Sequence, residues 1–148
     1  KGNLTQTDRT FIDNAIAYMN LDDIRHQYID NLSGGQRQRA YIAMTLAQDT
    51  DYILLDEPLN NLDMKHSVQI MQVLRKLATE LNKTVVIVIH DINFASCYSD
   101  YIVAMKNGKL VHQGEVNHIM QSPVLQDIYD MTIPIQDIDD HKIAVYFR

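Results

Sequence analysis

Two adjacent carboxylates, Asp56 and Glu57, directly follow the apolar run Tyr52–Leu55 and precede Pro58. A continuous run of this kind is typical of a strand buried on both faces, and ligands of open α/β sheets bind where such strands end. One carboxylate there can hold a hydrated Mg²⁺, and its neighbour can polarise a water molecule aimed at a phosphate. The alternative is that the two acids only end the strand, and the pair alone does not decide between these interpretations.

A second group of residues suited to an anion is Leu32–Gln36, with the sequence Leu-Ser-Gly-Gly-Gln. Ser33 and Gln36 have the spacing of a capping box, which predicts the start of a helix. The two glycines allow close approach to the backbone, and the dipole and free N–H groups of a helix start favour an anion. The alternative is a glycine-softened cap without a ligand. The same chain also carries the acid pair and a strand-end histidine, His90, and the three features together favour a phosphate site.

The pattern around the acid pair predicts a strand–helix–strand unit. Tyr52–Asp56 and Thr84–Ile89 are apolar runs of strand length, and both are expected to be buried on both faces. An amphipathic helix capped by Asp63 is expected between them. Strands joined by such a crossover are parallel, so Asp56-Glu57 and His90-Asp91 both follow the carboxyl ends of sheet strands.

Helices are predicted on the N-terminal side of this unit and a hairpin on its C-terminal side. We expect a helix capped by Thr7, a short turn at 21–25, and a short helix capped by Asp91. Asn107-Gly108 is the favoured pair for a type I′ turn, which predicts a hairpin between flanking strands. The remaining expectations are short helices near 116–120 and after 123, an acidic surface loop at 135–140, and a strand-like end at 143–147.

In this order and context, the motifs resemble those of the ATP-binding-cassette (ABC) family of nucleoside triphosphatases. Leu32–Gln36 is similar to the family's signature motif, and Tyr52–Pro58 is similar to its Walker B strand. Leu59–Asp63 resembles the D-loop, and His90 stands at the position of the switch histidine. The resemblance covers residues 7 to 114 in the family's order.

The resemblance implies a role for each of these residues. Asp56 would hold Mg²⁺, and Glu57 would be the catalytic carboxylate. His90 would bind the γ-phosphate and support Glu57. Asp63 would reach across a dimer toward the nucleotide site of the partner subunit. The signature residues would bind that same nucleotide from the other side: Ser33, Gly34, Gly35 and Gln36.

The resemblance also implies an α/β fold, namely the C-terminal part of a P-loop NTPase with parallel core strands, a terminal β-hairpin and part of the helical subdomain. Residues 1–48 would belong to the helical subdomain, 49–114 to the catalytic core and 115–148 to a C-terminal extension. The sequence contains no G-x-x-x-x-G-K-[ST] motif, the Walker A loop that cradles the phosphates. We therefore expect the chain alone to be inactive, and we expect missing strands to leave apolar sheet surface exposed.

Residues Asp56–Ser67 and His90–Asp100 resemble bacterial iron–siderophore importer ATPases in particular. This resemblance implies an ATPase subunit that uses ATP and Mg²⁺ and pairs head to tail with a second ATPase subunit. Such a subunit would lie peripherally on the cytoplasmic face of the membrane, against transmembrane permease subunits. Two alternatives stay open: an ABC ATPase that acts on nucleic acid or ribosomes, and a non-catalytic ABC-like binding module.

Composition restricts these alternatives. The chain has 148 residues, with 13 basic and 19 acidic side chains and a formal net charge of −6. This excess of acid disfavours binding to nucleic acid by bulk charge. No apolar run approaches the ~18 residues of a membrane-spanning helix. The presence of both Glu57 and His90 disfavours a module without turnover.

Overall fold

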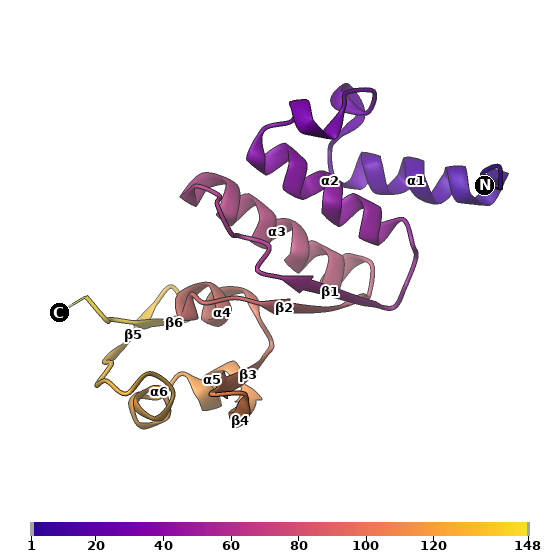
Figure 1. Cartoon of the computed structure of the whole chain (residues 1–148). Helices are drawn as coiled ribbons and strands as arrows, with labels where there is room; N and C mark the ends of the chain where they lie inside the picture. Colours follow the sequence, from indigo (N-terminus) through magenta and orange to yellow (C-terminus); the bar gives the residue numbers. More distant parts are fainter. Residues whose placement is uncertain (1, 148) are drawn as a thin grey trace. The chain divides into compact units, whose positions relative to one another are not determined.

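The computed structural model describes residues 2–147, which form two compact units divided between Val88 and Ile89. The α-helices and β-strands of both units are labelled in Figure 1. Over the described residues, no helix combines the length and the apolar character that crossing a membrane requires.

The first unit combines helices with a pair of parallel strands. Its strands β1 and β2 pair in parallel, with Leu54 opposite Val86 and Asp56 opposite Val88. This confirms the predicted strand–helix–strand unit. In chain order the elements are α1 (Gln6–Tyr18), the 3₁₀ turns η1 (Asp22–Ile24) and η2 (Ile29–Asn31), α2 (Gly34–Leu46), β1 (Tyr52–Asp56), α3 (Met64–Glu80) and β2 (Thr84–Val88).

The cap of α1 is Thr5, so the prediction of Thr7 is wrong. The Thr5 hydroxyl accepts a hydrogen bond from the Asp8 N–H, and the Asp8 carboxylate accepts one from the Thr5 N–H. Both threonines precede the apolar face of the helix, but only Thr5 has a side chain three positions later that can complete a capping box with a carboxylate or amide. Thr7 is followed at that spacing by Thr10.

The strands of the first unit are buried on one face only, which corrects the prediction of two buried faces. Ile53 is 1% exposed, whereas the neighbouring Leu54 is 72% exposed. Val86 and Val88 of β2 are about half exposed, at 49% and 51%. Side chains alternate between the two faces of a strand, so these exposed residues share one face. The expected exposed apolar sheet surface is therefore confirmed. The helix α3 packs against β2, and its buried residues Ile70, Met71, Leu74 and Leu77 contribute to the core.

A hydrogen bond joins the ends of α1 and α3. The Tyr18 hydroxyl donates to Oε2 of Glu80 at 3.0 Å. Burial, this hydrogen bond and the negative charge of Glu80 raise the pKa of Tyr18 from 10.0 to about 12. Because the folded-state pKa is raised, the stability that the neutral phenol contributes is complete below pH 10.0 and is lost as the pH rises through about 12.

A spectrophotometric titration of the tyrosines tests this pKa. We expect Tyr18→Phe to remove the ionisation step near pH 12, because that step belongs to the phenol held by Glu80. The control Tyr41→Phe removes a tyrosine that is 47% exposed and should leave this step in place. Persistence of the step near pH 12 in Tyr18→Phe would contradict the assignment.

The second unit contains two antiparallel hairpins. In the first, β3 pairs with β4, and the turn residues Asn107 and Gly108 have φ values of 52° and 72°. Positive φ at both positions confirms the predicted type I′ turn. In chain order the elements are α4 (Ile92–Tyr98), β3 (Tyr101–Lys106), β4 (Lys109–Glu115), α5 (Val116–Ile119), α6 (Ser122–Tyr129), β5 (Ile135–Ile138) and β6 (His141–Ala144).

The second hairpin corrects the prediction of a loop at 135–140. β5 and β6 pair antiparallel, and the turn between them is Asp139-Asp140, with φ values of 48° and 64°. The turn was missed because aspartates occupy both positions where Asn-Gly is the strong signal. The strand expected at 143–147 begins earlier, at His141, and ends at Ala144. The core of this unit consists of Ile92, Ile119, Met120, Leu125, Ile133 and Ala144.

Candidate functional site

The acid pair lies at the carboxyl end of β1. Asp56 is the last residue of the strand and pairs with Val88 in the parallel register. The Glu57 N–H donates to the Val88 carbonyl at 3.1 Å, which extends the pairing by one residue. Asp56 is exposed and Glu57 is half-buried, so both carboxylates stand at the sheet edge where the sequence places them.

Glu57 has an unusual backbone conformation and a side-chain partner. Its φ is 47°, in the left-handed region that a glutamate seldom adopts. Oε2 of Glu57 accepts a hydrogen bond from Nδ2 of Asn60 at 3.2 Å. Strained residues of this kind concentrate at functional sites. The contact of Asn60 was not predicted, since an asparagine in a turn is already explained by its backbone preference.

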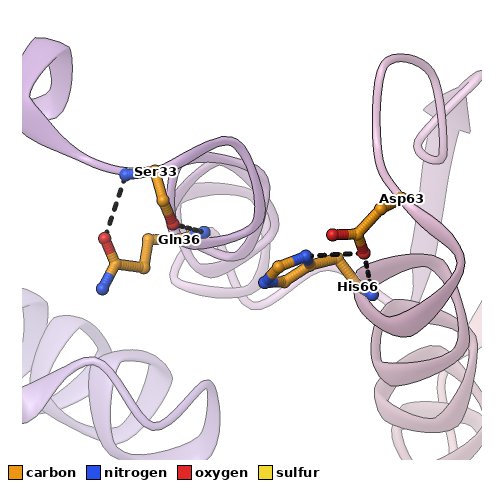
Figure 2. Close-up of polar contacts among 4 residues, drawn as sticks. All are labelled: Ser33, Gln36, Asp63 and His66. Carbon is orange, nitrogen blue, oxygen red and sulfur yellow. Dashed lines mark hydrogen bonds and ion pairs between the residues drawn. The ribbon is translucent and has the colours of Figure 1, made fainter.

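The D-loop residue Asp63 caps α3, as predicted. Oδ1 of Asp63 accepts a hydrogen bond from the His66 N–H at 2.9 Å, and it also lies 2.8 Å from Nδ1 of His66 (Figure 2). These hydrogen bonds, the backbone one first, lower the pKa of the Asp63 carboxyl. The structure thus places the ring of His66 on the D-loop aspartate.

The signature motif forms the predicted capping box at the start of α2. Oγ of Ser33 accepts a hydrogen bond from the Gln36 N–H at 3.3 Å, and Oε1 of Gln36 accepts one from the Ser33 N–H at 3.0 Å (Figure 2). The box therefore uses the N–H groups of Ser33 and Gln36. The N–H groups of Gly34 and Gly35 lie in the first helical turn, which has no intrahelical acceptors, and they suit an anion.

Gly35 seats the signature helix against the residues that follow the D-loop. The His66 ring extends from α3 toward the start of α2 (Figure 2), and a Cβ on Gly35 would lie 2.4 Å from Cδ2 of that ring. The neighbouring Gly34 has more space, because its Cβ would lie 3.6 Å from Cδ2 of Leu62. The structure thus joins the signature glycines to the D-loop through Leu62 and His66.

Arg37 binds the backbone segment that directly precedes the signature motif. Its Nε donates to the Ile29 carbonyl at 3.3 Å, and its Nη2 donates to the Asp30 carbonyl at 3.1 Å. Both acceptors belong to η2, which lies directly before the signature segment. Arg37 thus fixes the backbone that leads into Leu32.

His90 belongs to the second unit. It directly precedes Asp91, whose Oδ1 accepts hydrogen bonds from the N–H groups of Asn93 at 2.8 Å and Phe94 at 3.0 Å. Asp91 is therefore the predicted cap of α4. The first unit carries the signature, the acid pair and the D-loop, while the second carries His90.

The carboxylates were also tested for their fit to a metal ion. The described residues include no group of three or more His, Cys, Asp or Glu that could hold a metal by itself. Mg²⁺ does not require a group of three protein ligands, because it is usually bound through one or two carboxylates together with substrate phosphates and water. Asp56, exposed at the end of a strand, has the chemistry and the accessibility for this role.

Comparison with known proteins shows which class of protein this fold and these residues resemble. The ABC transporter family profile matches residues 3–60, a range that includes the signature and the acid pair. A bacterial ABC transporter cassette solved as a dimer is 35% identical, with a TM-score of 0.64, over 78% of this chain and 50% of that chain. In sequence and in fold, the chain is therefore similar to ABC ATPases.

More specific similarities lie within this family. The chain is 63% identical over 147 residues to the petrobactin import ATP-binding protein YclP of Bacillus subtilis (strain 168), covering 99% of this chain and 58% of that relative. A metal-chelate type ABC transporter in an inward-facing conformation is 26% identical, with a TM-score of 0.87, over 99% of this chain and 60% of that chain. The chain therefore spans about three fifths of the length of each.

Proposed function

We propose that the chain carries the signature, Walker B, D-loop and switch-histidine residues of the ATP-binding subunit of an iron–siderophore importer. The observation that carries this proposal is the acid pair at the carboxyl end of a parallel strand, with Glu57 held at a φ of 47°. The substrate class is supported by the 63% identity to a protein named for petrobactin import. This similarity favours import over an action on nucleic acid or ribosomes.

In this proposal the acid pair performs the chemistry of one nucleotide site. Asp56 is the carboxylate that holds Mg²⁺, which neutralises charge on the phosphates when it is bound. Glu57 orients and deprotonates the attacking water. His90 contacts the γ-phosphate and supports Glu57. The strained backbone of Glu57 and its bond from Asn60 aim the carboxylate before the substrate arrives.

The signature residues act on the nucleotide of a second subunit. Ser33, Gly34, Gly35 and Gln36 present a helix start to the partner's phosphates, and Asp63 reaches the same site. This requires a head-to-tail dimer, which the similarity to a dimeric cassette supports. We further propose that the dimer lies peripherally on the cytoplasmic face of the membrane against permease subunits. The division into helical subdomain (1–48), catalytic core (49–114) and C-terminal extension (115–148) is part of this proposal.

The experiment compares the chain alone with a chimera that joins it to the part of the Bacillus subtilis relative that it does not match. The chain alone is expected to show no tight, Mg²⁺-dependent binding of a fluorescent nucleotide, because its sequence has no Walker A motif. The chimera is expected to hydrolyse ATP, and a chimera with its Walker A lysine replaced by Ala serves as the control. Tight binding by the chain alone, or a folded chimera without turnover, would contradict the proposal.

A further inference from the structure

We propose that the C-terminal hairpin β5–β6 positions His90 by clamping α4, and that Asn93 is the positioning residue through which the hairpin acts. The inference rests on the proposed function of His90. It gives the C-terminal segment, which the motifs leave without a role, a part in the ATPase reaction.

The clamp consists of hydrogen bonds between α4 and the backbone of β6. Nδ2 of Asn93 donates to the Ala144 carbonyl at 3.1 Å, and the Ala144 N–H donates to Oδ1 of Asn93 at 2.7 Å. The side-chain amide thus pairs with Ala144 as a neighbouring strand would. A third bond runs from Oγ of Ser96 to the Lys142 carbonyl at 2.6 Å. Ala144 is fully buried, so these backbone groups have no access to water as an alternative partner.

The same asparagine is tied to the residue that follows His90. The backbone N–H of Asn93 donates to Oδ1 of Asp91 at 2.8 Å, and this bond fixes the cap of α4. Asn93 therefore holds Asp91 with its backbone and β6 with its side chain. Because His90 is covalently joined to Asp91, a displacement of β6 changes the backbone position of His90.

Residues of the C-terminal segment also pack beside His90. Ile92 belongs to one core cluster with Ile133 and Ala144, which lie in or beside the C-terminal hairpin. His90 borders a hollow of about 410 Å³, and Tyr129 and Tyr146 contribute to the lining of this hollow. The C-terminal segment thus shapes the surroundings of His90 as well as its backbone. If the bonds between Asn93 and Ala144 only stabilised the second unit, their loss would leave the surroundings of His90 unchanged. Experiments can therefore distinguish a structural role from a positioning role.

The first test is made on the chain itself by NMR. Asn93→Ala removes both bonds to Ala144, and Asn93→Asp keeps an acceptor for the Ala144 N–H but removes the donor. We expect Asn93→Ala to accelerate hydrogen exchange of the Ala144 amide about tenfold, because the two bonds are lost. We also expect it to shift or broaden the Hε1 resonance of His90. Asn93→Asp sets a carboxylate oxygen against the Ala144 carbonyl and is expected to have an effect in the same direction.

The matched control is Asn117→Ala, which truncates an exposed asparagine of the same unit. It should leave both the Ala144 amide and the His90 resonance unchanged. Methyl resonances of Leu125 and Ile133 report whether the core remains folded in each variant. The clamp is refuted if the Ala144 amide exchanges faster in a folded variant while the His90 resonance stays as in the unsubstituted chain. If Asn93→Ala does not fold, the same criterion is applied to Asn93→Asp.

The second test measures turnover in the chimera. Misplacement of His90 should lower kcat by about tenfold or more in Asn93→Ala, with a much smaller change in the KM for ATP. Asn117→Ala should leave both values unchanged. An unchanged kcat in Asn93→Ala, or equal changes in kcat and KM, would overturn the positioning role. If the unsubstituted chimera has no turnover, the proposed function fails, and the NMR result still decides whether the hairpin positions His90.

Discussion

Replacement of Glu57 by Gln is expected to lower ATP turnover by the chimera at least ~100-fold, because general-base catalysis contributes 10²–10⁴-fold. The amide has nearly the shape of the carboxylate but does not accept a proton from water. Its carbonyl oxygen still accepts the hydrogen bond that Nδ2 of Asn60 donates at 3.2 Å. The left-handed backbone of Glu57 should therefore be retained, and the loss should be chemical rather than structural.

Nucleotide binding separates these two effects. A fluorescent nucleotide should bind the Glu57→Gln chimera as tightly as the unsubstituted one, and ATP-dependent dimerisation should persist in size-exclusion chromatography. Glu115→Gln makes the same chemical change at an exposed residue of the second unit and should leave turnover unchanged. Hydrolysis at the original rate by Glu57→Gln would refute the assignment of Glu57 as the base.

Substitution of Gly35 by Ala is expected to destabilise the chain by about 1–3 kcal/mol, the usual cost of inserting a methyl group into a well-packed site. The new Cβ would lie 2.4 Å from Cδ2 of His66. The ring has little freedom to move away, because Oδ1 of Asp63 lies 2.8 Å from its Nδ1. Relief of the clash therefore requires that the signature helix or the Asp63–His66 contact be displaced.

Gly34 provides the matched control for this prediction. The same methyl group on Gly34 would lie 3.6 Å from Leu62, an ordinary contact, so Gly34→Ala should be neutral or slightly stabilising. Combining Gly35→Ala with His66→Ala should restore much of the lost stability, which makes the two substitutions non-additive. Chemical denaturation of the chain measures all four variants. Equal effects of Gly34→Ala and Gly35→Ala, or a double variant less stable than the sum of the singles, would show that the ring is not the obstacle.

Features that depend on neighbouring residues were predictable from the sequence. The capping box of Ser33 and Gln36, the cap at Asp63 and the turn at Asn107-Gly108 were all predicted at the residues where the structure has them. A cap or a two-residue turn is stabilised by contacts within about four positions, so local sequence specifies it. The parallel pairing of β1 and β2 was also predictable, because the length of the crossover requires it.

Features that depend on distant partners were not predictable in this way. The runs Tyr52–Asp56 and Thr84–Val88 are apolar enough for burial on both faces, yet only the packing of the whole unit decides which faces are covered. The hairpin after Ile135 was hidden because its turn is Asp139-Asp140 and its stability comes from packing on α4. The sequence also does not specify that the carbonyls of the preceding turn lie within hydrogen-bond distance of Arg37.

The sequence by itself predicted the resemblance to ABC ATPases and the residues of the candidate site, because the signature, the acid pair, the D-loop and His90 are recognised by residue type and order. Tertiary structure alone decided how these residues are held. The His66 ring meets Gly35 only because α2 and α3 pack together. Asn93 meets Ala144, 51 positions away, only because β6 packs on α4. Such contacts depend on the geometry of packed elements, which residue order along the chain does not specify.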